Sequence, residues 1–486
     1  MAPLKICFVS SEIAPFAKAG GLADVAQALP EHLQRQGHDV RVFMPFYGKI
    51  DTEAYDFTAV DFLRGVHLRM GDHVFTFSVF VARAPNSQVD VYFLHCPQLF
   101  HGDHIYTGEW DEHLRFSLLT RGAIECCQRM GWGPDIFHCN DWHTALLPLY
   151  LKTLYSWDQL FARSKTVYTI HNIAYQGVFP AEVIGNLGLD EYRHLLFQSD
   201  LEQGAISFMK TGVLYADVVT TVSRTYAQEI QTEAYGMGLE ALLRQRSSSV
   251  VGIVNGVDYS QWSPQEDPLI PYNYGIDDVA EGKERNKQHL CESTGLVHDE
   301  AAPMIGVVSR LTSQKGLELT YEALPEALRY LNIRAVILGT GESDIENHFH
   351  WLQRTFPQKV CYYRGYNNEL AHLIEAGADI FLMPSRFEPC GLNQMYSLKY
   401  GTVPIVRKTG GLADTVELFD PATGRGTGFV FEHYDKTGFG WALKTALTTY
   451  QDRDAWEQLR RNGMEVDFSW DKQGAEYETL YRQLAD

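Results

Sequence analysis

The chain has 486 residues and 45% of them are hydrophobic, so it is long enough to bury two large cores. Its 41 Lys and Arg stand against 61 Asp and Glu, which gives a net charge of −20. A surface of this charge repels phosphate backbones and anionic lipid, which makes nucleic acid and membrane surfaces poor candidate partners. An anionic ligand would need a local cluster of lysine and arginine.

The eight cysteines are scattered, without a C-x-x-C pair or a zinc-type spacing, which favours a reducing compartment. No apolar run approaches the ~20 residues that span a bilayer. The N-terminal segment reaches Glu12 after one short apolar run, too early for a secretory signal. We therefore expect a soluble cytoplasmic protein, or a protein of the plastid stroma if the source is a plant or an alga and a transit peptide has been removed.

Short β-branched and aromatic runs alternate with longer stretches of helical periodicity along the whole chain. This alternation is typical of βαβ units with parallel sheets, and it predicts an α/β protein with two doubly wound sheets. Strands are expected at residues 6–10, 40–44, 91–95, 136–139, 167–170 and 218–222 in the first half, and at 305–309, 335–339, 360–363, 380–383, 403–406 and 428–431 in the second.

The alternation breaks at the sequence N-G-V-D at 255–258, which is followed by W-S-P at 262–264 and a polar stretch over 265–274. We place a hinge near 255–265 and a ligand cleft between the two domains. The sequence K-A-G-G-L-A-D at 18–24 returns as K-T-G-G-L-A-D at 408–414, each time between a predicted strand and a predicted helix. This echo supports two related halves.

The first copy of this motif is a candidate anion site. Gly20 and Gly21 would bring backbone N–H groups to the start of a helix, where they can bind an anion beside the cation of Lys18. A tight turn with a solvated lysine is an equally good interpretation of the motif alone.

A second candidate anion site follows the first strand of the second half. Arg310 and Lys315 lie on one loop at the carboxyl end of that strand, where open α/β sheets bind ligands, and they could hold a diphosphate without a metal. Surface cations that pair with carboxylates are the alternative.

In the segment M-P-S-R-F-E-P-C-G-L-N-Q at 383–394, Glu388 could accept hydrogen bonds from sugar hydroxyls, while N–H groups at 390–392 face a phosphate. A plain helix-start charge is the other interpretation of Glu388.

In the first half, two neighbouring predicted strands end in polar residues. One is followed by Asn140, Asp141 and His143, and the other by His171. These side chains would point into the proposed cleft, although a hydrogen-bonded structural histidine is the commoner role for such a residue. Metal ligation by His138, His143 and His171 is a further alternative, which no H-x-x-x-H pair or carboxylate cluster supports.

These motifs resemble the bacterial glycogen synthase and plant starch synthase family, the ADP-glucose-dependent α-1,4-glucan synthases. The resemblance spans nearly the whole chain and rests on K-A-G-G-L-A-D-V, N-D-W-H, T-I-H-N-I-A-Y-Q-G, N-G-V-D, S-R-L-T-S-Q-K-G, and S-R-F-E-P-C-G-L-N-Q with Y-G-T-V-P-I-V-R-K-T-G-G-L-A-D-T-V. It implies the glycosyltransferase-B fold, two Rossmann-like doubly wound domains facing across a cleft. The implied domains are 1–255 on the acceptor glucan side, 256–466 on the nucleotide-sugar donor side, and a C-terminal helix at 467–486 that crosses back to the first domain.

Carried over position by position, the resemblance implies a role for each motif residue, with no metal and no cofactor. Arg310 and Lys315 would neutralise the diphosphate, Glu388 would hold the glucose, and Tyr366 would lie by the adenine. Asp141 would contact the acceptor. The implied catalytic set is His171, Arg310, Lys315 and Glu388, and the implied donor-binding set is Lys18, Gly21, Asn255, Arg310, Lys315, Tyr366, Glu388, Cys390, Gly391 and Leu392.

The implied reaction is a retaining, metal-independent transfer of glucose from ADP-glucose to the non-reducing-end 4-hydroxyl of an α-1,4-glucan such as glycogen or starch. Three positions depart from common patterns. Asn393 stands where many relatives carry Thr, Ala19 replaces the Thr of K-T-G-G, and Tyr396 occupies the second position of the E-x7-E pair, which the synthases also lack. A related transferase that uses UDP-glucose and a catalytically silent glucan-binding scaffold protein remain as alternatives. The intact phosphate cations argue against the scaffold.

Overall fold

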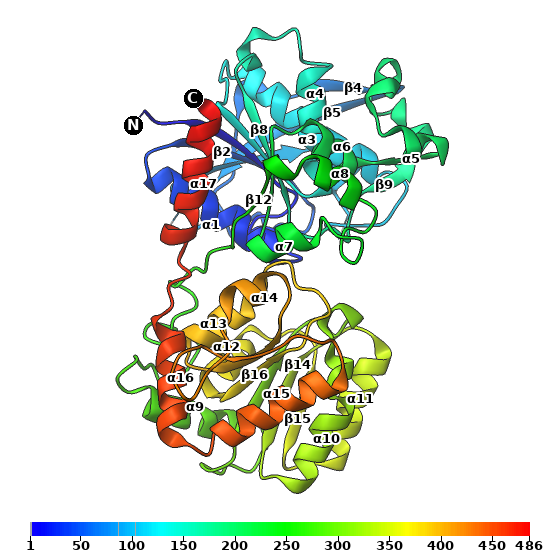
Figure 1. Ribbon diagram of the computed structural model, residues 1–486. Coiled ribbons are helices and arrows are strands. Elements are labelled where there is room, and N and C mark those ends of the chain that lie inside the picture. Colours follow the sequence, from blue (N-terminus) through cyan, green and yellow to red (C-terminus); the bar gives the residue numbers. More distant parts are fainter. Residues whose placement is uncertain (1, 86, 103) are drawn as a thin grey trace. The chain divides into compact units, whose positions relative to one another are not determined.

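The computed structural model describes residues 2–85, 87–102 and 104–486, which divide into two compact units. The first comprises Met1–Val222, Ala227–Gly256 and Trp470–Asp486, and the second comprises Ser223–Tyr226 and Val257–Ser469. The chain therefore passes into the second unit after Gly256 and returns with its last helix, α17 (Trp470–Ala485). Figure 1 shows the element labels used below.

The sheet of the second unit has six parallel strands in the order β15-β14-β13-β16-β17-β18. In chain order this is 3-2-1-4-5-6, the doubly wound order of the Rossmann fold. The strands are β13 (Met304–Val308), β14 (Arg334–Gly339), β15 (Val360–Arg364), β16 (Ile380–Met383), β17 (Val403–Arg407) and β18 (Phe429–Phe431).

The sheet of the first unit repeats this order and extends it. Seven parallel strands run as 3-2-1-4-5-6-7 from β6 to β12, and antiparallel β5 joins the edge at β6, with β3 and β4 paired to β5. The strands are β1 (Lys5–Val9), β2 (Asp39–Pro45), β3 (Thr58–Ala59), β4 (Val66–Met70), β5 (His73–Ala82), β6 (Asp90–His95), β7 (Ile136–Asn140), β8 (Lys165–Ile170), β11 (Val218–Thr221) and β12 (Val250–Gly252), with a separate hairpin of β9 (Val178–Pro180) and β10 (Ala205–Ser207).

All twelve predicted strands are confirmed, with bounds that differ by at most two residues. The expectation of purely parallel sheets is wrong for the first unit, because β5 runs antiparallel to β6. In β4, buried and exposed residues alternate. This two-residue period marks a meander with one solvated face, and it was not recognised beside the stronger βαβ pattern.

Helices cover both faces of each sheet. In the first unit they are α1 (Gly21–Arg35), α2 (Pro97–Phe100), α3 (Glu112–Arg129), α4 (Leu147–Lys152), α5 (Gln198–Glu202), α6 (Phe208–Tyr215), α8 (Glu240–Gln245) and α17, while α7 (Arg224–Glu229) spans a boundary between the units. In the second unit they are α9 (Val279–Thr294), α10 (Thr320–Tyr330), α11 (Ser343–Thr355), α12 (Asn368–Gly377), α13 (Asn393–Lys399), α14 (Gly410–Thr415), α15 (Lys436–Thr449) and α16 (Arg453–Glu465).

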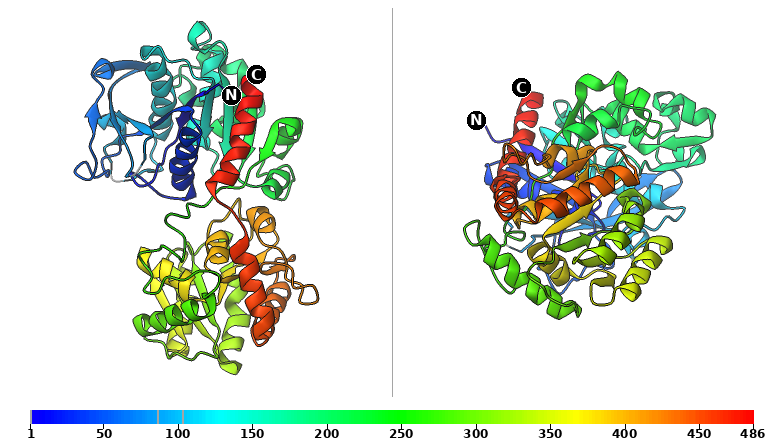
Figure 2. Two further views of the ribbon diagram at one scale, coloured as in Figure 1. Left: turned by 90° about the vertical axis from the view of Figure 1, so that its left-hand side faces the viewer. Right: turned by 60° about the horizontal axis from the view of Figure 1, so that its bottom comes forward.

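The last helix belongs to the first unit by packing as well as by position. Helix α17, red in Figures 1 and 2, packs against α1, and the Tyr481 hydroxyl bonds the Nδ1 atom of the buried His138 on β7 at 2.5 Å. A Cβ on Gly474 would lie 2.3 Å from the ring of His32, so only glycine permits this close approach of the two helices. None of the helices in the described ranges is long and apolar enough to cross a membrane.

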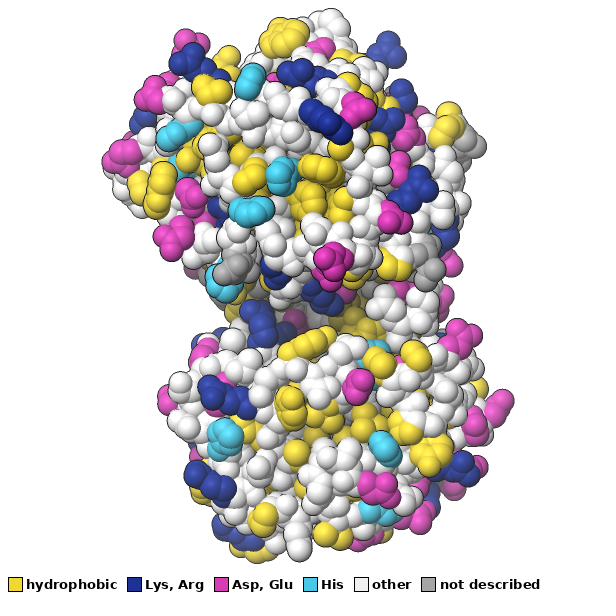
Figure 3. Space-filling view, turned by 180° about the vertical axis from the view of Figure 1, so that it is seen from behind, with side chains coloured by type: hydrophobic (Ala, Val, Ile, Leu, Met, Phe, Trp, Pro, Cys, Tyr) yellow, Lys and Arg dark blue, Asp and Glu magenta, His cyan; other side chains and the backbone are white. Residues whose placement is uncertain are grey.

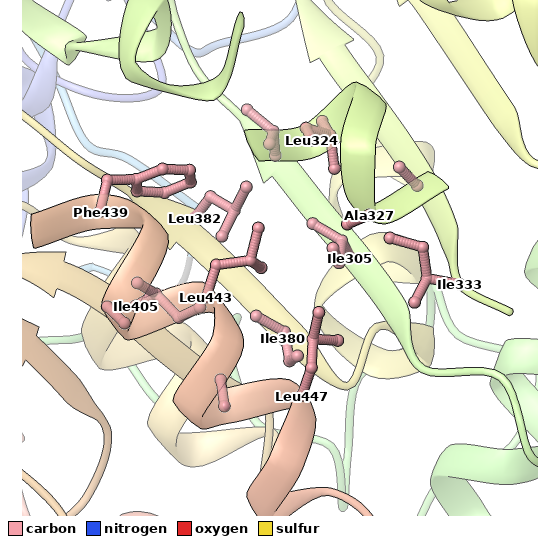
Figure 4. Packing of buried hydrophobic residues seen from close by; sticks show 14 of the residues in the cluster. Ile305, Leu324, Ala327, Ile333, Ile380, Leu382, Ile405, Phe439, Leu443 and Leu447 are labelled. Atoms are coloured by element: carbon pink, nitrogen blue, oxygen red, sulfur yellow. The ribbon is translucent and has the colours of Figure 1, made fainter. Parts of the chain in front are cut away.

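The acidic surface and the hydrophobic core agree with the net negative charge and the hydrophobic content of the sequence. Acidic side chains are spread over both units on the face shown in Figure 3. Inside the second unit, Phe439, Leu443 and Leu447 of α15 pack on alternate residues of the strands, including Ile305 and Ile380 (Figure 4). The other face of the same sheet packs against α9 and α12. Because both faces are covered, the strands read as near-continuous apolar runs, which explains why the sequence predicts them so closely.

Candidate functional site

In each unit several of the candidate residues follow the first and the fourth parallel strand, while His171, Asn255 and Tyr366 follow other strands. The strand order reverses between these two strands, and open α/β sheets bind ligands at the carboxyl edge of such a reversal. In the second unit, the loops after β13 and β16 carry Arg310, Lys315 and Glu388. In the first unit, the loops after β1 and β7 carry Lys18 and Asp141. The topology therefore places the predicted residues at equivalent positions of two similar sheets.

The two loops of the second unit are in direct contact. Gly316 has a φ of +67°, and a Cβ at this position would lie 2.1 Å from the carbonyl oxygen of Pro384. The Arg386 N–H donates to the carbonyl of Gln314 at 2.8 Å. A glycine is therefore required where the loop after β13 crosses the loop after β16.

This contact brings two of the predicted residues together. The Lys315 Nζ lies 2.7 Å from the Oε2 of Glu388, and the Ser385 hydroxyl donates to the same oxygen at 2.9 Å. Glu388 is 5% exposed, so its carboxylate is a buried polar group that needs the partners it has here. The side chain of Arg310, which belongs to the same loop as Lys315, is exposed.

The segment after Glu388 leads into α13 through a backbone that only glycine adopts readily. Gly391 has a φ of +72°, and Leu392 precedes the first helical residue. The Gln394 side-chain amide donates to the carbonyls of Cys390 and Gly391 at 3.1 and 2.9 Å. Cys390 is buried, so it packs rather than faces solvent.

The departure at Asn393 has a structural explanation. Its side-chain amide donates to the carbonyl oxygen of Val308, the last residue of β13, at 2.8 Å. The asparagine therefore connects the start of α13 to the strand that precedes Arg310.

Tyr366 lies just beyond β15; it is 79% exposed, and its hydroxyl donates to Asn368 Oδ1 at 3.0 Å. Among the described residues, no hydrogen bond or ion pair joins Tyr366 to Lys315 or to Glu388.

In the first unit, Asp141 and His171 are joined through the backbone. The Oδ1 of Asp141 accepts the N–H of His171 at 2.7 Å. Asp141 has a φ of +54°, which is strained for a residue with a Cβ and is found most often at functional positions. The structure thus joins Asp141, the residue predicted to contact the acceptor, to His171, a member of the predicted catalytic set.

The hydrogen bonds of Asn140 fix the tautomer of His171. The Asn140 amide nitrogen donates to the carbonyl of Val9 at 3.0 Å, so its Oδ1 must accept from the Nε2–H of His171 at 2.9 Å. The Nδ1 atom of His171 is then left unprotonated and can accept a hydrogen bond. Burial lowers the pKa of His171 to about 3, so the ring is neutral at physiological pH.

Burial acts on Asp141 in the opposite direction. It raises the pKa of the carboxyl group to about 7, against the hydrogen bonds from the backbone of His171 and Asn172. A carboxyl group with a pKa near 7 can bind and release a proton under working conditions, as perturbed groups at functional sites often do.

A second carboxylate of the first unit was missed by the sequence reasoning. Glu12, 3% exposed, follows β1, and its Oε2 accepts the N–H groups of Ala19 and Gly20 at 2.5 and 2.9 Å. Its Oε1 accepts a very short hydrogen bond from the Tyr106 hydroxyl, which also lies 2.9 Å from Ser11 Oγ. A glutamate three residues after the end of a buried parallel strand was a signal that could have marked it as a candidate, although not which groups it would bind.

These bonds revise the prediction for the first glycine motif. The N–H groups expected to meet an anion do so, but at Ala19 and Gly20 the anion is Glu12. The helix starts at Gly21, twelve residues after Val9, the last residue of β1, rather than directly after the strand. The Lys18 ammonium pairs with Asp24 at 2.6 Å and is exposed to solvent.

Asn255 follows β12 at the end of the first unit and is 5% exposed. Its Oδ1 is buried without a hydrogen-bond partner within the described ranges. Buried polar atoms are nearly always satisfied, so this oxygen is a candidate contact for a ligand.

The alternative of a histidine metal site does not form. Across the residues that the structure describes, no three His, Cys, Asp or Glu side chains are grouped as metal ligands. Both ring nitrogens of His138 are within hydrogen-bond distance of hydroxyls, from Tyr481 at 2.5 Å and Thr169 at 2.6 Å. The Nδ1 of His143 lies 3.2 Å from Ser11 Oγ.

Two doubly wound sheets with charged loops at their strand-order reversals have the architecture of the GT-B glycosyltransferases, and comparison with known families shows that the chain is of this class. Residues 5–245 match the family described as starch synthase catalytic domain, and residues 292–463 match glycosyl transferases group 1. The chain is 46% identical to a glycogen synthase of Desulforudis audaxviator, covering 100% of this chain and 97% of that one. It is 41% identical to a glycogen synthase of Thermotoga maritima, covering 99% of each.

A solved structure gives the same result. The catalytic domain of starch synthase IV from Arabidopsis thaliana, bound to ADP and acarbose, superposes with a TM-score of 0.92 at 34% identity, over 100% of both chains. The chain therefore belongs to the glycogen and starch synthase family and is a glucosyltransferase that acts in α-glucan synthesis.

Proposed function

We propose that this enzyme elongates an α-1,4-glucan by transferring glucose from ADP-glucose to the non-reducing-end 4-hydroxyl, with retention of the α configuration. The ADP bound in the related Arabidopsis structure supports the adenine nucleotide. The observation that carries the proposal is the ion pair between the half-buried Lys315 and the buried Glu388, on the loops at the strand-order reversal of the second unit. A cation there suits a diphosphate and a carboxylate suits sugar hydroxyls.

The donor would be held mainly by the second unit. Arg310 and Lys315 would bind the diphosphate, and the N–H groups around Gly391 would add to them. Glu388 would accept hydrogen bonds from the glucose, and the exposed ring of Tyr366 would stack on the adenine. The other proposed donor contacts are Lys18, Gly21, Asn255, Cys390 and Leu392.

In the reaction, the bond between C1 of glucose and the β-phosphate oxygen breaks and a bond from C1 to the acceptor O4 forms on the same face. The departing phosphate oxygen takes the proton of the 4-hydroxyl, so the products are ADP and a glucan longer by one residue. Negative charge grows on the diphosphate as the bond breaks, and Arg310 and Lys315 would stabilise it.

The first unit would position the acceptor and the glucosyl group. His171 is neutral with an unprotonated Nδ1, so it can accept a hydrogen bond from a sugar hydroxyl without repelling the positive charge that develops at C1. Asp141, which binds the backbone of His171, would stand on the acceptor side. No residue is assigned as a covalent nucleophile.

The test is nucleoside diphosphate release by the purified enzyme with a glycogen primer and either ADP-glucose or UDP-glucose, each with and without EDTA. We expect primer-dependent ADP release that survives EDTA. A preference for UDP-glucose would overturn the donor, and loss of activity in EDTA would overturn the metal-independent step. No release from either donor, with glycogen still bound, would favour the scaffold protein.

Variants of the second unit test the cations. Arg310→Ala and Lys315→Ala should each lower kcat by about 100-fold or more while glucan binding changes little, since a preorganised charge acts mainly in the transition state. Lys408→Ala removes an exposed cation of the same unit that pairs with Glu432 at 2.7 Å, and it is the matched control. Near-normal turnover in either Arg310→Ala or Lys315→Ala would refute the assignment.

A further inference from the structure

Three aromatic rings of the second unit are stacked face to face. The indole of Trp262 lies between the ring of His372, at a centroid distance of 3.7 Å and an angle of 13°, and the ring of Tyr396, at 4.1 Å and 1°. His372 and Tyr396 are buried, and Trp262 is half-buried. Such ring pairs contribute more to stability than the area they bury. We call these three residues the Trp262 stack.

The rings of the stack come from three separate segments. Trp262 belongs to the entry segment, residues 257–274, which begins where the chain passes into the second unit after Gly256. His372 lies on α12 and Tyr396 lies on α13. The stack therefore connects the entry segment to two helices that follow it by more than a hundred residues.

A buried carboxylate joins the same three segments. The Oδ2 atom of Asp267, in the entry segment, lies 2.8 Å from the Nδ1 of His372 and accepts the hydroxyl of Tyr400, directly after α13, at 2.6 Å. Burial raises the pKa of Asp267, but the bonds from His372 and Tyr400 lower it by more, so the pKa lies below its usual value. An ionised carboxylate only accepts hydrogen bonds, so the Nδ1 of His372 carries a proton. The entry segment thus holds α13 at Tyr396 and again at Tyr400.

The first turn of α13 is bonded to both donor loops. The helix starts at Asn393, whose side chain donates to the carbonyl of Val308 at the end of β13. The Gln394 amide donates to the carbonyls of Cys390 and Gly391. Because α13 has only seven residues, a shift of its second turn would displace these contacts as well.

The stack also explains the residue at the second position of the E-x7-E pattern. Tyr396 is 9% exposed and its ring is parallel to the Trp262 indole. A glutamate here would lose the stacking and would place a carboxylate in a buried site, at a cost in desolvation. In this chain the position therefore serves to pack the helix.

We propose that Trp262 is a positioning residue for the donor site: with His372 and Tyr396 it holds α13, and thereby the segment 388–392, in the place that glucosyl transfer requires. The inference rests on the proposed function for the role of that segment. It adds to that function a residue of the entry segment that lies outside the proposed catalytic and donor-binding sets.

The test measures kcat and KM with ADP-glucose and glycogen, and ADP affinity by calorimetry. Trp262→Leu removes the stacked indole and should lower kcat about tenfold and weaken ADP binding about fivefold, since small misplacements of a binding group are costly. The KM for glycogen should stay within about twofold of the wild-type value, because ground-state glucan binding is unaffected. Trp262→Phe keeps a ring and should keep kcat within about threefold.

Tyr396→Leu breaks the same stack from the side of α13 and should reproduce the kcat of Trp262→Leu. The double variant should be no slower than either single variant, because both substitutions remove one shared interaction. Hydrogen exchange of the amides at 390–394, measured without ligand, should be faster in both single variants than in the wild-type enzyme.

Trp456→Leu is the matched control. Trp456 is 3% exposed in the same unit and stacks on Phe429 at 6.4 Å and 18°, outside the Trp262 stack. It should lower the Tm while kcat, measured well below that temperature, stays within about twofold. An equal loss of kcat in Trp456→Leu would make the effect of Trp262→Leu a general destabilisation and would overturn the inference.

Unchanged kcat in Trp262→Leu, or a kcat in Trp262→Phe as low as in Trp262→Leu, would also overturn it. If Trp262→Leu does not fold, Tyr396→Leu and Trp262→Phe provide the same comparison. Because hydrogen exchange needs no donor, a wild-type enzyme that releases no ADP from ADP-glucose would refute the proposed function, while unchanged exchange at 390–394 in both single variants would refute the role of the stack.

Discussion

The two copies of K-x-G-G-L-A-D use the same residues for different purposes. In the first unit, the N–H groups of Ala19 and Gly20 bind the carboxylate of Glu12. In the second unit, Gly410 and Gly411 press against the main chain after β16 instead, where a Cβ on either would lie within 2.0 Å of a carbonyl oxygen. One copy binds a side-chain anion, and the other permits close packing.

The difference decides what each unit leaves available. The first copy uses its amides to hold Glu12, so that carboxylate is structural as well as close to the candidate site. In the second copy the Gly411 N–H donates to the backbone carbonyl of Glu388 at 3.0 Å, and the carboxylate of Glu388 pairs with Lys315 instead. The two copies of the motif therefore have the same sequence but different binding partners, because the loops packed against them differ.

The largest expected effect comes from exchanging glycine for alanine at matched positions. Gly410 has a φ of +43° and its Cβ would lie 1.9 Å from the Glu388 carbonyl, so Gly410→Ala should cost about 2–5 kcal/mol of stability through backbone strain and overlap. Gly20 has a φ of −150° and no atom within 4 Å of its Cβ position. Gly20→Ala should cost at most about 1 kcal/mol, the loss of a favourable N-cap.

Thermal unfolding measures this pair, with hydrogen exchange to show which unit opens. We expect Gly410→Ala to lower the Tm of the second unit by roughly 5–15 °C, while Gly20→Ala moves the Tm of the first unit by only a few degrees. Equal shifts would mean that the two turns are equivalent after all.

A second prediction concerns the charges of the two sites. In the second unit Glu388 is paired with Lys315, whereas in the first unit Asp141 and His171 have pKa values displaced by burial to about 7 and about 3. Between pH 4 and 7 the folded chain binds more protons than the unfolded chain at Asp141, so that group lowers stability as pH rises. Between pH 3 and 6.5 the unfolded chain binds more protons at His171, so that group raises stability as pH rises.

The two slopes oppose each other and nearly cancel from about pH 4 to 6.5, at about 1.4 kcal/mol per pH unit each. His171→Gln should therefore gain stability on acidification from pH 6.5 to 5, and Asp141→Asn should lose it, relative to the wild-type enzyme. Urea unfolding at a series of pH values measures both. Parallel profiles for the two variants would contradict the displaced pKa values.

Much of this arrangement could be predicted from the sequence, and the reason is physical. Parallel strands buried on both faces are continuous apolar runs, so β13 and β16 and the loops that follow them were located directly. The pairing of Lys315 with Glu388 joins residues 73 positions apart, and it depends on the crossing of two loops at Gly316. Local patterns hold no information on such a crossing.

The first unit was harder for the same reason. Glu12 precedes the glycine motif by several residues. The sequence around it does not indicate that its carboxylate binds the amides of that motif and the hydroxyl of Tyr106. The strained backbone of Asp141 and the tautomer of His171 also arise from tertiary hydrogen bonds. Sequence motifs identified the residue types, while their protonation states followed only from burial.

The third prediction tests whether the N–H groups of Ala19 and Gly20 bind the carboxylate of Glu12. Glu12→Gln replaces charge-assisted hydrogen bonds with neutral ones and should cost about 1–3 kcal/mol. The loss should be local, so exchange of the amides at 19 and 20 should become faster while the amide of Gly411, which bonds a backbone carbonyl, is unaffected. Faster exchange at both copies would point to a general loosening of the chain.

The smallest effect on stability is expected at the lysines of the two copies. Lys18 pairs with Asp24 and Lys408 pairs with Glu432, and the side chains of both lysines are more than half exposed. Exposed ion pairs contribute little, so Lys18→Ala and Lys408→Ala should each change stability by no more than about 0.5 kcal/mol.

Ligand binding should distinguish the two lysine variants, because only Lys18 is a proposed donor contact. Lys18→Ala should weaken ADP binding about tenfold, the loss of one charge-assisted contact to a phosphate, while Lys408→Ala leaves it within twofold. Titration calorimetry with ADP measures both variants. Equal affinities would remove Lys18 from the donor site and leave the first copy of the motif with a structural role alone.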